Sequence, residues 1–284
     1  MAAGIHHLTR AAATGRHYSR PGVFPAIPGL NAVARTAAGD LVVTGSGAPP
    51  YGTLAERFPS PGAMRFPLPP GASPEAVAAG VNPGMASWLP LTAHKGDLGT
   101  VLILGVTGMS GYLAAQNAAL LSATRVVGAG RSPEALSRAA RSGAQTVVLT
   151  GDREADAAAL ASALDGELPN LVLDFVWGPV AETAFQALLR PGRGSGTSYV
   201  QIGALAGADA AVPSVLLASA NVTIAGSGAG SVSPADIKTQ IPRYIELIAS
   251  GKVQVPYRTY GLSQIAEAWP ESARSGPRVV IVPD

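Results

Sequence analysis

The strongest constraint on this chain is a run of three glycines at intervals of three residues, between an apolar stretch and an alanine-rich stretch. Residues 101–104 are apolar and partly β-branched, residues 112–121 have a helical composition, and residues 125–128 are apolar again. Strand, glycine turn, helix and strand in this order predict the first βαβ unit of a dinucleotide-binding sheet. The common G-x-G-x-x-G pattern would need glycine at position 106, where this chain has Val106, so the match is to the variant G-x-x-G-x-x-G. A glycine turn in another kind of α/β protein therefore stays the alternative.

Each glycine of this turn has a separate predicted task. Gly105 allows a sharp turn after the strand, Gly108 allows the backbone to approach a pyrophosphate, and Gly111 allows the helix to pack close to the strand. Free N–H groups at the start of the helix would meet the phosphate charge. The predicted cofactor contacts of this turn are Gly105, Thr107, Gly108, Met109, Ser110 and Gly111.

The residue that follows the second predicted strand indicates whether the chain prefers NAD or NADP. Chains that bind NAD usually carry an acidic residue about 20 residues after the glycines, where it binds the ribose 2′-hydroxyl. Here that place holds Arg131, and no acid precedes Glu134. A guanidinium suits the 2′-phosphate of NADPH through charge-assisted hydrogen bonds, and the predicted site includes the neighbouring Ser132. The alternative for Arg131 is a solvated arginine at a strand end.

Composition narrows the class of protein further. The 284 residues are 47% hydrophobic and 13% charged, which allows a sizeable core in one large or two modest domains. The net charge of +2 gives no reason to expect a nucleic acid partner. Because the chain has no cysteine, it has neither disulfides nor thiolate ligands for zinc. No apolar run is long enough to span a membrane and no signal peptide is evident, so the cytoplasm is the expected location.

Residues 91–250 alternate regularly between strand and helix patterns, which predicts a parallel doubly wound sheet. The predicted strands are 101–105, 125–128, 146–149, 171–175, 198–202 and 222–225. The predicted helices are 110–122, 133–142, 153–164, 179–189 and 234–249. Two of these helices begin with serine followed by proline, a favourable N-cap and first helical position.

The two ends of the chain differ from its middle. Residues 1–90 are rich in proline and glycine, and they predict an antiparallel, loop-rich β domain. Its predicted elements are strands at 41–44 and 51–56 and a short helix at 73–79. Residues 251–284 predict strand, helix and strand, and the last strand is expected to return to the first domain.

Several stretches resemble, in order along the chain, the motifs of zinc-independent medium-chain dehydrogenases/reductases of the quinone oxidoreductase and enoyl reductase type. They are Tyr18…Pro28-Gly29-Leu30, residues 51–56, Leu68-Pro69-Pro70-Gly71, residues 86–89, the glycine turn, Gln201-Ile202-Gly203 and residues 262–269. The resemblance implies an α/β fold with a GroES-like β-barrel domain at 1–90 and 251–284. A Rossmann domain that binds NADPH would be inserted at 91–250.

The chain departs from the family pattern in two places. The family usually has about two more strands before the stretch that matches residues 2–18, so an N-terminally short barrel is expected. It also usually has an acid and two glycines after the Pro28-Gly29 pair, where this chain has Leu30-Asn31-Ala32-Val33-Ala34.

The resemblance also assigns roles to single residues. Tyr18 stands where enoyl reductases of the family have a tyrosine beside the nicotinamide, so it is the predicted proton donor; packing of the cleft wall is the alternative. His6 falls where relatives often have an asparagine that contacts the cofactor, and with Tyr51 and Trp88 it is a predicted pocket residue. The alternatives are a surface position for His6 and packing at the domain junction for Trp88. The further predicted cofactor contacts, at the ends of two later strands, are Gly203, Gly226 and Ser227.

The predicted function is reduction of a small quinone or α,β-unsaturated carbonyl by hydride transfer from NADPH, in a homodimer paired through residues 222–225. No metal site is predicted, because four histidines and no cysteine leave few ligands. Two alternatives stay open. One is an NADPH-binding protein of the same fold that has lost catalysis. The other is an alcohol dehydrogenase, which the missing thiolates disfavour.

Overall fold

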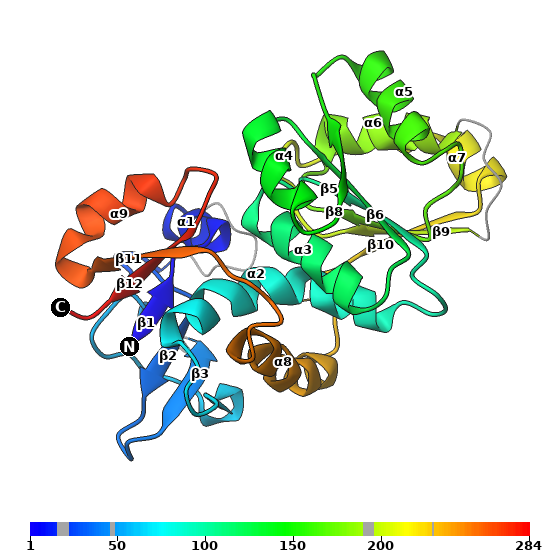
Figure 1. Ribbon diagram of the computed structural model, residues 1–284. Helices are drawn as coiled ribbons and strands as arrows, with labels where there is room; N and C mark the ends of the chain where they lie inside the picture. Colours follow the sequence, from blue (N-terminus) through cyan, green and yellow to red (C-terminus); the bar gives the residue numbers. More distant parts are fainter. Residues whose placement is uncertain (16–22, 46–48, 190–195, 229) are drawn as a thin grey trace. The chain divides into compact units, whose positions relative to one another are not determined.

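The structure is a computed structural model that describes residues 1–15, 23–45, 49–189, 196–228 and 230–284. It divides into two compact units (Figure 1). One unit consists of Met1–Met85 with Pro234–Asp284, and the other is Ala86–Ser233. The sequence placed these boundaries after residues 90 and 250 instead, so the helix at 234–249 joins the terminal segments and not the middle of the chain.

The unit Ala86–Ser233 is built around a six-stranded sheet with the order β10-β9-β8-β5-β6-β7. Every neighbouring pair in this sheet is parallel. The strands are β5 (Thr100–Leu104), β6 (Arg125–Gly130), β7 (Gln145–Val148), β8 (Leu171–Asp174), β9 (Thr197–Gln201) and β10 (Val222–Gly226). This order extends from β5 in both directions, which confirms the predicted doubly wound sheet.

Helices cover both faces of this parallel sheet (Figure 1). The helices α3 (Met109–Leu120) and α4 (Pro133–Ala140) pack on one face, around a core that includes Val101 and Ile103. The helices α5 (Arg153–Ala163), α6 (Gly178–Leu189) and α7 (Ser214–Ser219) pack on the other, around Leu102 and Leu104. Strand residues therefore alternate between two buried faces, as in parallel sheets generally. Helix α7 lies where the sequence predicted no element.

The other unit contains a mixed six-stranded sheet with the order β11-β12-β1-β2-β3-β4. Its strands are β1 (Ala2–Gly4), β2 (Asn31–Arg35), β3 (Leu41–Gly45), β4 (Phe66–Pro67), β11 (Tyr257–Gly261) and β12 (Arg278–Val282). β1 pairs antiparallel with both β2 and β12, whereas β11 and β12 are parallel. The terminal strand β12 thus pairs with β1, in the first domain to which the sequence predicted its return.

Four α-helices and two 3₁₀ turns complete the description of the terminal segments and of the link between the units. They are α1 (His7–Ala13), η1 (Gly62–Met64), α2 (Pro74–Ala93), α8 (Pro234–Ala249), η2 (Leu262–Gln264) and α9 (Ile265–Glu271). No helix among the described residues is long and apolar enough to cross a membrane.

Helix α2 is much longer than the predicted helix at 73–79. Two of its glycines lie inside the helix, because side chains from a later part of the chain pack directly against them. A Cβ at Gly84 would overlap the side chain of Tyr244, which is fully buried on α8. A Cβ at Gly80 would lie 2.5 Å from Val255 and 2.9 Å from Ile248. The close approach of α8 outweighs the low helix propensity of glycine, and sequence alone did not reveal it.

The predicted strand at 51–56 was wrong. The backbone N–H of Leu54 donates to the Pro28 carbonyl at 3.0 Å, and the N–H of Ile27 donates to the Pro50 carbonyl at 2.9 Å. A Cβ at Gly52 would overlap the carbonyl oxygens of residues 27 and 28. These residues therefore pair with an irregular loop and not with a sheet ladder.

Candidate functional site

The carboxyl ends of the parallel strands meet at one edge of the sheet in the unit Ala86–Ser233. The strands β5, β6 and β7 follow one another in one direction, and β8, β9 and β10 follow one another in the other. The direction of winding therefore reverses between the neighbours β5 and β8. In open α/β sheets, ligands bind in the crevice outside the carboxyl ends at such a reversal. This edge is the candidate functional site.

The turn from β5 into α3 lies at this edge. Gly105 has a φ of +87°, a left-handed conformation that favours glycine. The N–H groups of Gly105 and Val106 donate to the Ala129 carbonyl at 3.0 and 3.1 Å, which anchors the turn to β6. Gly108 is the N-cap of α3, and its carbonyl accepts the N–H of Tyr112 at 2.8 Å.

The N–H groups of Met109, Ser110 and Gly111 lead the helix. None of the three donates a hydrogen bond within the part of the chain that the structure describes. The N-cap residue has no side chain that could accept from them. Since the positive end of the helix dipole lies here, the start of α3 is suited to a phosphate group.

The two later glycines of the turn have different surroundings. A Cβ at Gly111 would overlap the Gly105 carbonyl oxygen and lie 2.6 Å from Val106 Cα, so this glycine permits close packing of helix and strand. A Cβ at Gly108 would have only the Gly105 carbonyl oxygen nearby, at 3.6 Å. Nothing in the described protein requires glycine at position 108, and the space beside it is open.

Arg131 and Ser132 follow β6 at the same edge. Arg131 is exposed, and its guanidinium has no hydrogen-bond or ion-pair partner among the described residues. The Ser132 hydroxyl oxygen accepts the N–H of Ala135 at 3.3 Å and so caps α4, which leaves the hydroxyl proton for another acceptor. Both side chains can therefore donate to an anion.

Asp174, at the end of β8, is fully buried and has a structural role. Its Oδ1 accepts the N–H groups of Val176 and Trp177 at 2.8 and 2.9 Å, and its Oδ2 accepts the Tyr199 hydroxyl at 2.6 Å. Burial raises the pKa of Asp174, and these three donors oppose that rise. The carboxylate stabilises a turn in which Trp177 has a φ of +55°. Sequence reasoning missed Tyr199, since only the fold brings it to this turn.

The predicted cofactor contacts at the ends of β9 and β10 differ in how many of their backbone groups already make hydrogen bonds within the protein. The Gly203 N–H donates to the Asp174 carbonyl at 3.1 Å, and the Gly203 carbonyl accepts from Gln201 Nε2 at 2.9 Å. The Ser227 N–H donates to the Gln201 carbonyl at 2.8 Å. A Cβ at Gly226 would have no atom within 4 Å, so this glycine faces open space.

The predicted catalytic and pocket residues are scattered in what the structure describes. Tyr18, the predicted proton donor, lies outside the described residues. His6 is not a surface residue: only 3% of it is exposed. Tyr51 is 53% exposed, whereas Trp88, on α2, is 7% exposed. His6 and Tyr51 belong to one unit and Trp88 to the other, so their shared pocket stays a prediction.

His6 belongs to a buried polar cluster that the sequence did not predict. Neither ring nitrogen of His6 has a hydrogen-bond partner, and Asn31 Oδ1 and Arg278 Nε also lack one among the described residues. Burial holds the pKa of His6 well below its ordinary value, and the positive charge of Arg278 adds to the fall. Arg278 is itself buried, which lowers its pKa to about 10. The imidazole is therefore neutral at physiological pH.

The comparisons with known proteins agree with this geometry. Residues 111–282 match the family described as "Zinc-binding dehydrogenase". A protein of Emericella nidulans named "Probable NADPH-dependent quinone reductase" is 34% identical over 224 residues, which are 74% of this chain and 62% of that protein. The chain thus spans less than two thirds of the length of this curated relative.

Solved structures of quinone oxidoreductases have the same fold. The enzyme from Thermus thermophilus superposes with a TM-score of 0.79 at 23% identity, covering 99% of this chain and 88% of that one. The enzyme from Escherichia coli, solved with NADPH, gives 0.79 at 22% identity, covering 99% and 89%. These likenesses confirm the predicted GroES-like and Rossmann fold class. Because the family match covers more than half of the chain, the protein belongs to the zinc-binding dehydrogenase family and has the fold of its quinone oxidoreductases.

Proposed function

We propose that this protein is an NADPH-dependent oxidoreductase that reduces quinones or α,β-unsaturated carbonyls without zinc. The main support is the carboxyl edge of the parallel sheet. There the start of α3 offers N–H groups without partners among the described residues, Gly108 borders open space, and Arg131 presents an exposed guanidinium. A pyrophosphate and a 2′-phosphate need donors of these two kinds.

The names of related proteins support the same cofactor and substrate class. The Emericella nidulans relative is named as NADPH-dependent and as a quinone reductase. The solved Thermus thermophilus and Escherichia coli enzymes are quinone oxidoreductases described in complex with NADPH.

The residues divide the work of holding the cofactor. The N–H groups of 109–111 would hold the pyrophosphate, and Arg131 and Ser132 would hold the 2′-phosphate. Gly226 and Ser227, with Gly203, would face the nicotinamide end. When bound, NADPH supplies the hydride. The protein must then provide donors for the oxygen that gains negative charge and a proton for the α-carbon, and Tyr18 is the proposed donor.

The residues that the structure describes do not fit a catalytic zinc site. Such a site takes three protein ligands from histidine, cysteine and carboxylates. The chain has no cysteine, and no three candidate ligands cluster within the described residues. The proposed reduction therefore relies on no zinc ion held by the described residues.

A protein of the same fold that binds NADPH without catalysis is the second candidate. Its support is the segment after Gly29, where the family resemblance implies an acid and two glycines and this chain has neither. Residues 31–35 form strand β2 there, and Asn31 Nδ2 donates to the Ala78 carbonyl at 3.2 Å. A spectrophotometric screen of NADPH oxidation over quinones and enones separates the two candidates, since only an enzyme consumes NADPH.

The substitution Arg131→Asp tests the cofactor assignment. A hydrogen bond to a charged group contributes about 1.5–3 kcal/mol, and the exposure of Arg131 favours the lower end. NADPH should therefore bind roughly tenfold more weakly or worse, while the new carboxylate should favour the ribose of NADH. Fluorescence titration with both nucleotides measures the change. Arg141→Asp, at an exposed position at the far end of α4, is the charge-matched control. Unchanged NADPH preference in Arg131→Asp would contradict the assignment.

A homodimer paired through β10 is also proposed. β10 is an edge strand of the described sheet, and edge strands with free backbone groups invite pairing. The Ser227 N–H points toward β9, because it donates to the Gln201 carbonyl. By alternation, the N–H of Ile224 points outward. Exposed apolar side chains nearby in sequence, Val215 and Leu217 on α7, add surface that a partner could cover.

A further inference from the structure

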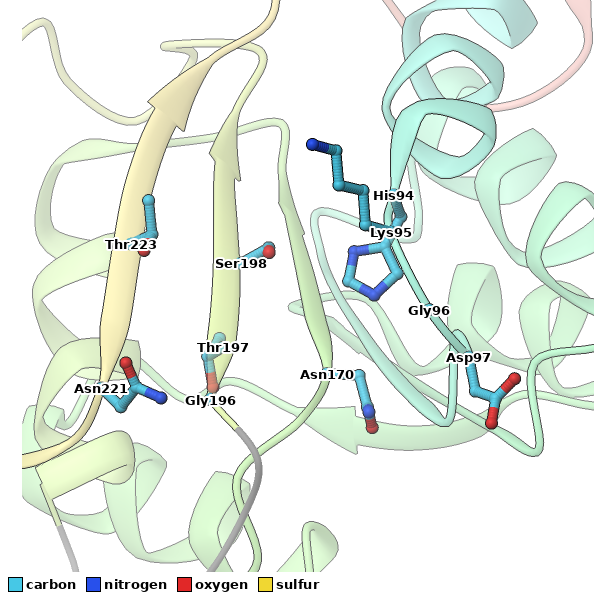
Figure 2. A pocket seen from close by; sticks show the side chains of 10 residues that line it. All are labelled: His94, Lys95, Gly96, Asp97, Asn170, Gly196, Thr197, Ser198, Asn221 and Thr223. Atoms are coloured by element: carbon cyan, nitrogen blue, oxygen red, sulfur yellow. The ribbon is translucent and has the colours of Figure 1, made fainter.

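A polar hollow of about 470 Å³ lies at the amino edge of the parallel sheet, opposite the edge that carries the glycine turn. It is formed by the loop before β5 and by the residues at the starts of β8, β9 and β10 (Figure 2). Its main side chains are His94, Lys95, Asn170, Ser198, Asn221 and Thr223. All of them belong to the unit Ala86–Ser233. The volume falls within the range of about 300–1,000 Å³ that small-molecule sites have.

Hydrogen-bond donors predominate in this hollow. The Lys95 ammonium and the Ser198 and Thr223 hydroxyls have no partner among the residues that the structure describes. Asn170 Oδ1 accepts the Thr100 N–H at 3.0 Å, so the amide group of Asn170 keeps its two N–H donors. A site with several donors and few acceptors is suited to an anion.

The charged side chains that line the hollow also favour an anion. Figure 2 shows the Lys95 side chain extended beside the strands, with the Ser198 hydroxyl directed toward the loop that carries it. Among the described lining residues Asp97 is the one carboxylate, and its side chain is directed away from the strands. The ammonium therefore has no counter-ion within the described residues.

We propose that this hollow binds a small phosphate monoester that carries hydroxyl groups, of the size of a sugar phosphate. The phosphate lies between Lys95 and Ser198, where the positive charge is unpaired within the described chain. The hydroxyl groups of the ligand lie toward Asn170, whose amide keeps its two N–H donors. The site is independent of the cofactor edge, because the amino and carboxyl ends of parallel strands lie at opposite edges of a sheet.

Titrations followed by ¹⁵N NMR test the proposal with three probes: glucose 6-phosphate, inorganic phosphate and glucose. Signals of Lys95, Ser198 and the Asn170 side chain report on the hollow, while signals of Gly108 and Gly111 report separately on the glycine turn. Glucose 6-phosphate should shift the hollow signals saturably and more tightly than inorganic phosphate, and glucose should not shift them. Lys95→Met should weaken this binding about tenfold or more, because it removes a charge-assisted bond.

Two controls make the result decisive. Lys252→Met removes the same charge from an exposed position in the other unit and should leave binding unchanged. Ser198→Ala removes one hydroxyl and should weaken phosphate binding without changing the melting temperature. The proposal is overturned if the hollow signals do not move at millimolar glucose 6-phosphate. It is also overturned if Lys95→Met binds as the wild type does, or if phosphate and glucose 6-phosphate bind equally.

Discussion

Two glycines of the turn between β5 and α3 should respond in opposite ways to the same substitution. Gly108→Ala and Gly111→Ala each add a single methyl group, three residues apart on the same turn. The structure assigns one glycine to packing within the protein and leaves the other beside open space. The two variants therefore separate a structural requirement from a ligand requirement.

Gly111→Ala should destabilise the protein. The new methyl group would overlap the Gly105 carbonyl oxygen and lie 2.6 Å from Val106 Cα. Both are backbone atoms, so no side chain can rotate away, and the helix must move from the strand. Overpacking of this kind costs about 1–3 kcal/mol, against roughly 0.5–1 kcal/mol gained from the helix propensity of alanine. The melting temperature should fall by several degrees, at about 2–4 °C per kcal/mol.

Gly108→Ala should leave the fold intact and weaken NADPH binding. Its φ of −78° suits any residue, and the new methyl group would have only the Gly105 carbonyl oxygen near it, at 3.6 Å. The unfolded chain loses some freedom, which stabilises the fold by about 0.4–1 kcal/mol, but alanine is a poorer N-cap than glycine, so stability should stay about unchanged. The methyl group would occupy the space proposed for the pyrophosphate, and a steric cost of about 1–3 kcal/mol corresponds to roughly fivefold to 150-fold weaker binding.

Thermal unfolding by circular dichroism without nucleotide, and fluorescence titration with NADPH, measure the two effects. Gly62→Ala is the control for both assays, because a Cβ there has no atom within 4 Å and its φ lies outside the left-handed region. A Gly111→Ala protein that melts like the wild type would refute the packing argument. A Gly108→Ala protein that binds NADPH with wild-type affinity would refute the assignment of this space to the nucleotide.

Three further predictions concern stability and assembly. Burial and the charge of Arg278 hold the pKa of His6 well below 6.5, so below pH 6.5 it is mainly the unfolded chain that binds a proton at this histidine. The free energy of unfolding should therefore fall by up to about 1.4 kcal/mol for each pH unit below 6.5, and denaturant melts of His6→Gln should show a smaller slope. Tyr199→Phe removes the hydroxyl that donates to buried Asp174 at 2.6 Å, and the free energy of unfolding should drop by about 1–3 kcal/mol. Ile224→Pro removes an outward N–H of β10, so sedimentation should show a monomer where the wild type is a dimer; a monomeric wild type would contradict the pairing.

The half of the fold that contains the parallel sheet was predictable because its signals are local. A left-handed turn at Gly105 needs glycine, and the Ser132-Pro133 pair starts a helix through a cap within three residues. Alternating strand and helix patterns with short connections leave few topologies other than a doubly wound sheet. The return of the last strand to the first domain was also predicted, since a strand that follows a completed sheet needs another partner; only the structure showed that this partner is β1.

Contacts between distant parts of the chain decided the rest. Helix α2 continues through Gly84 because Tyr244, far along the chain, packs against that position. Asp174 is a turn-holding carboxylate because β9 brings the Tyr199 hydroxyl to it, and His6 is buried near Arg278, from the opposite end of the chain. Local patterns reveal which residues can form an element, since propensities and caps act over a few residues. Burial and the pairing of polar groups depend on which distant segment packs beside them, and only the tertiary structure determines that.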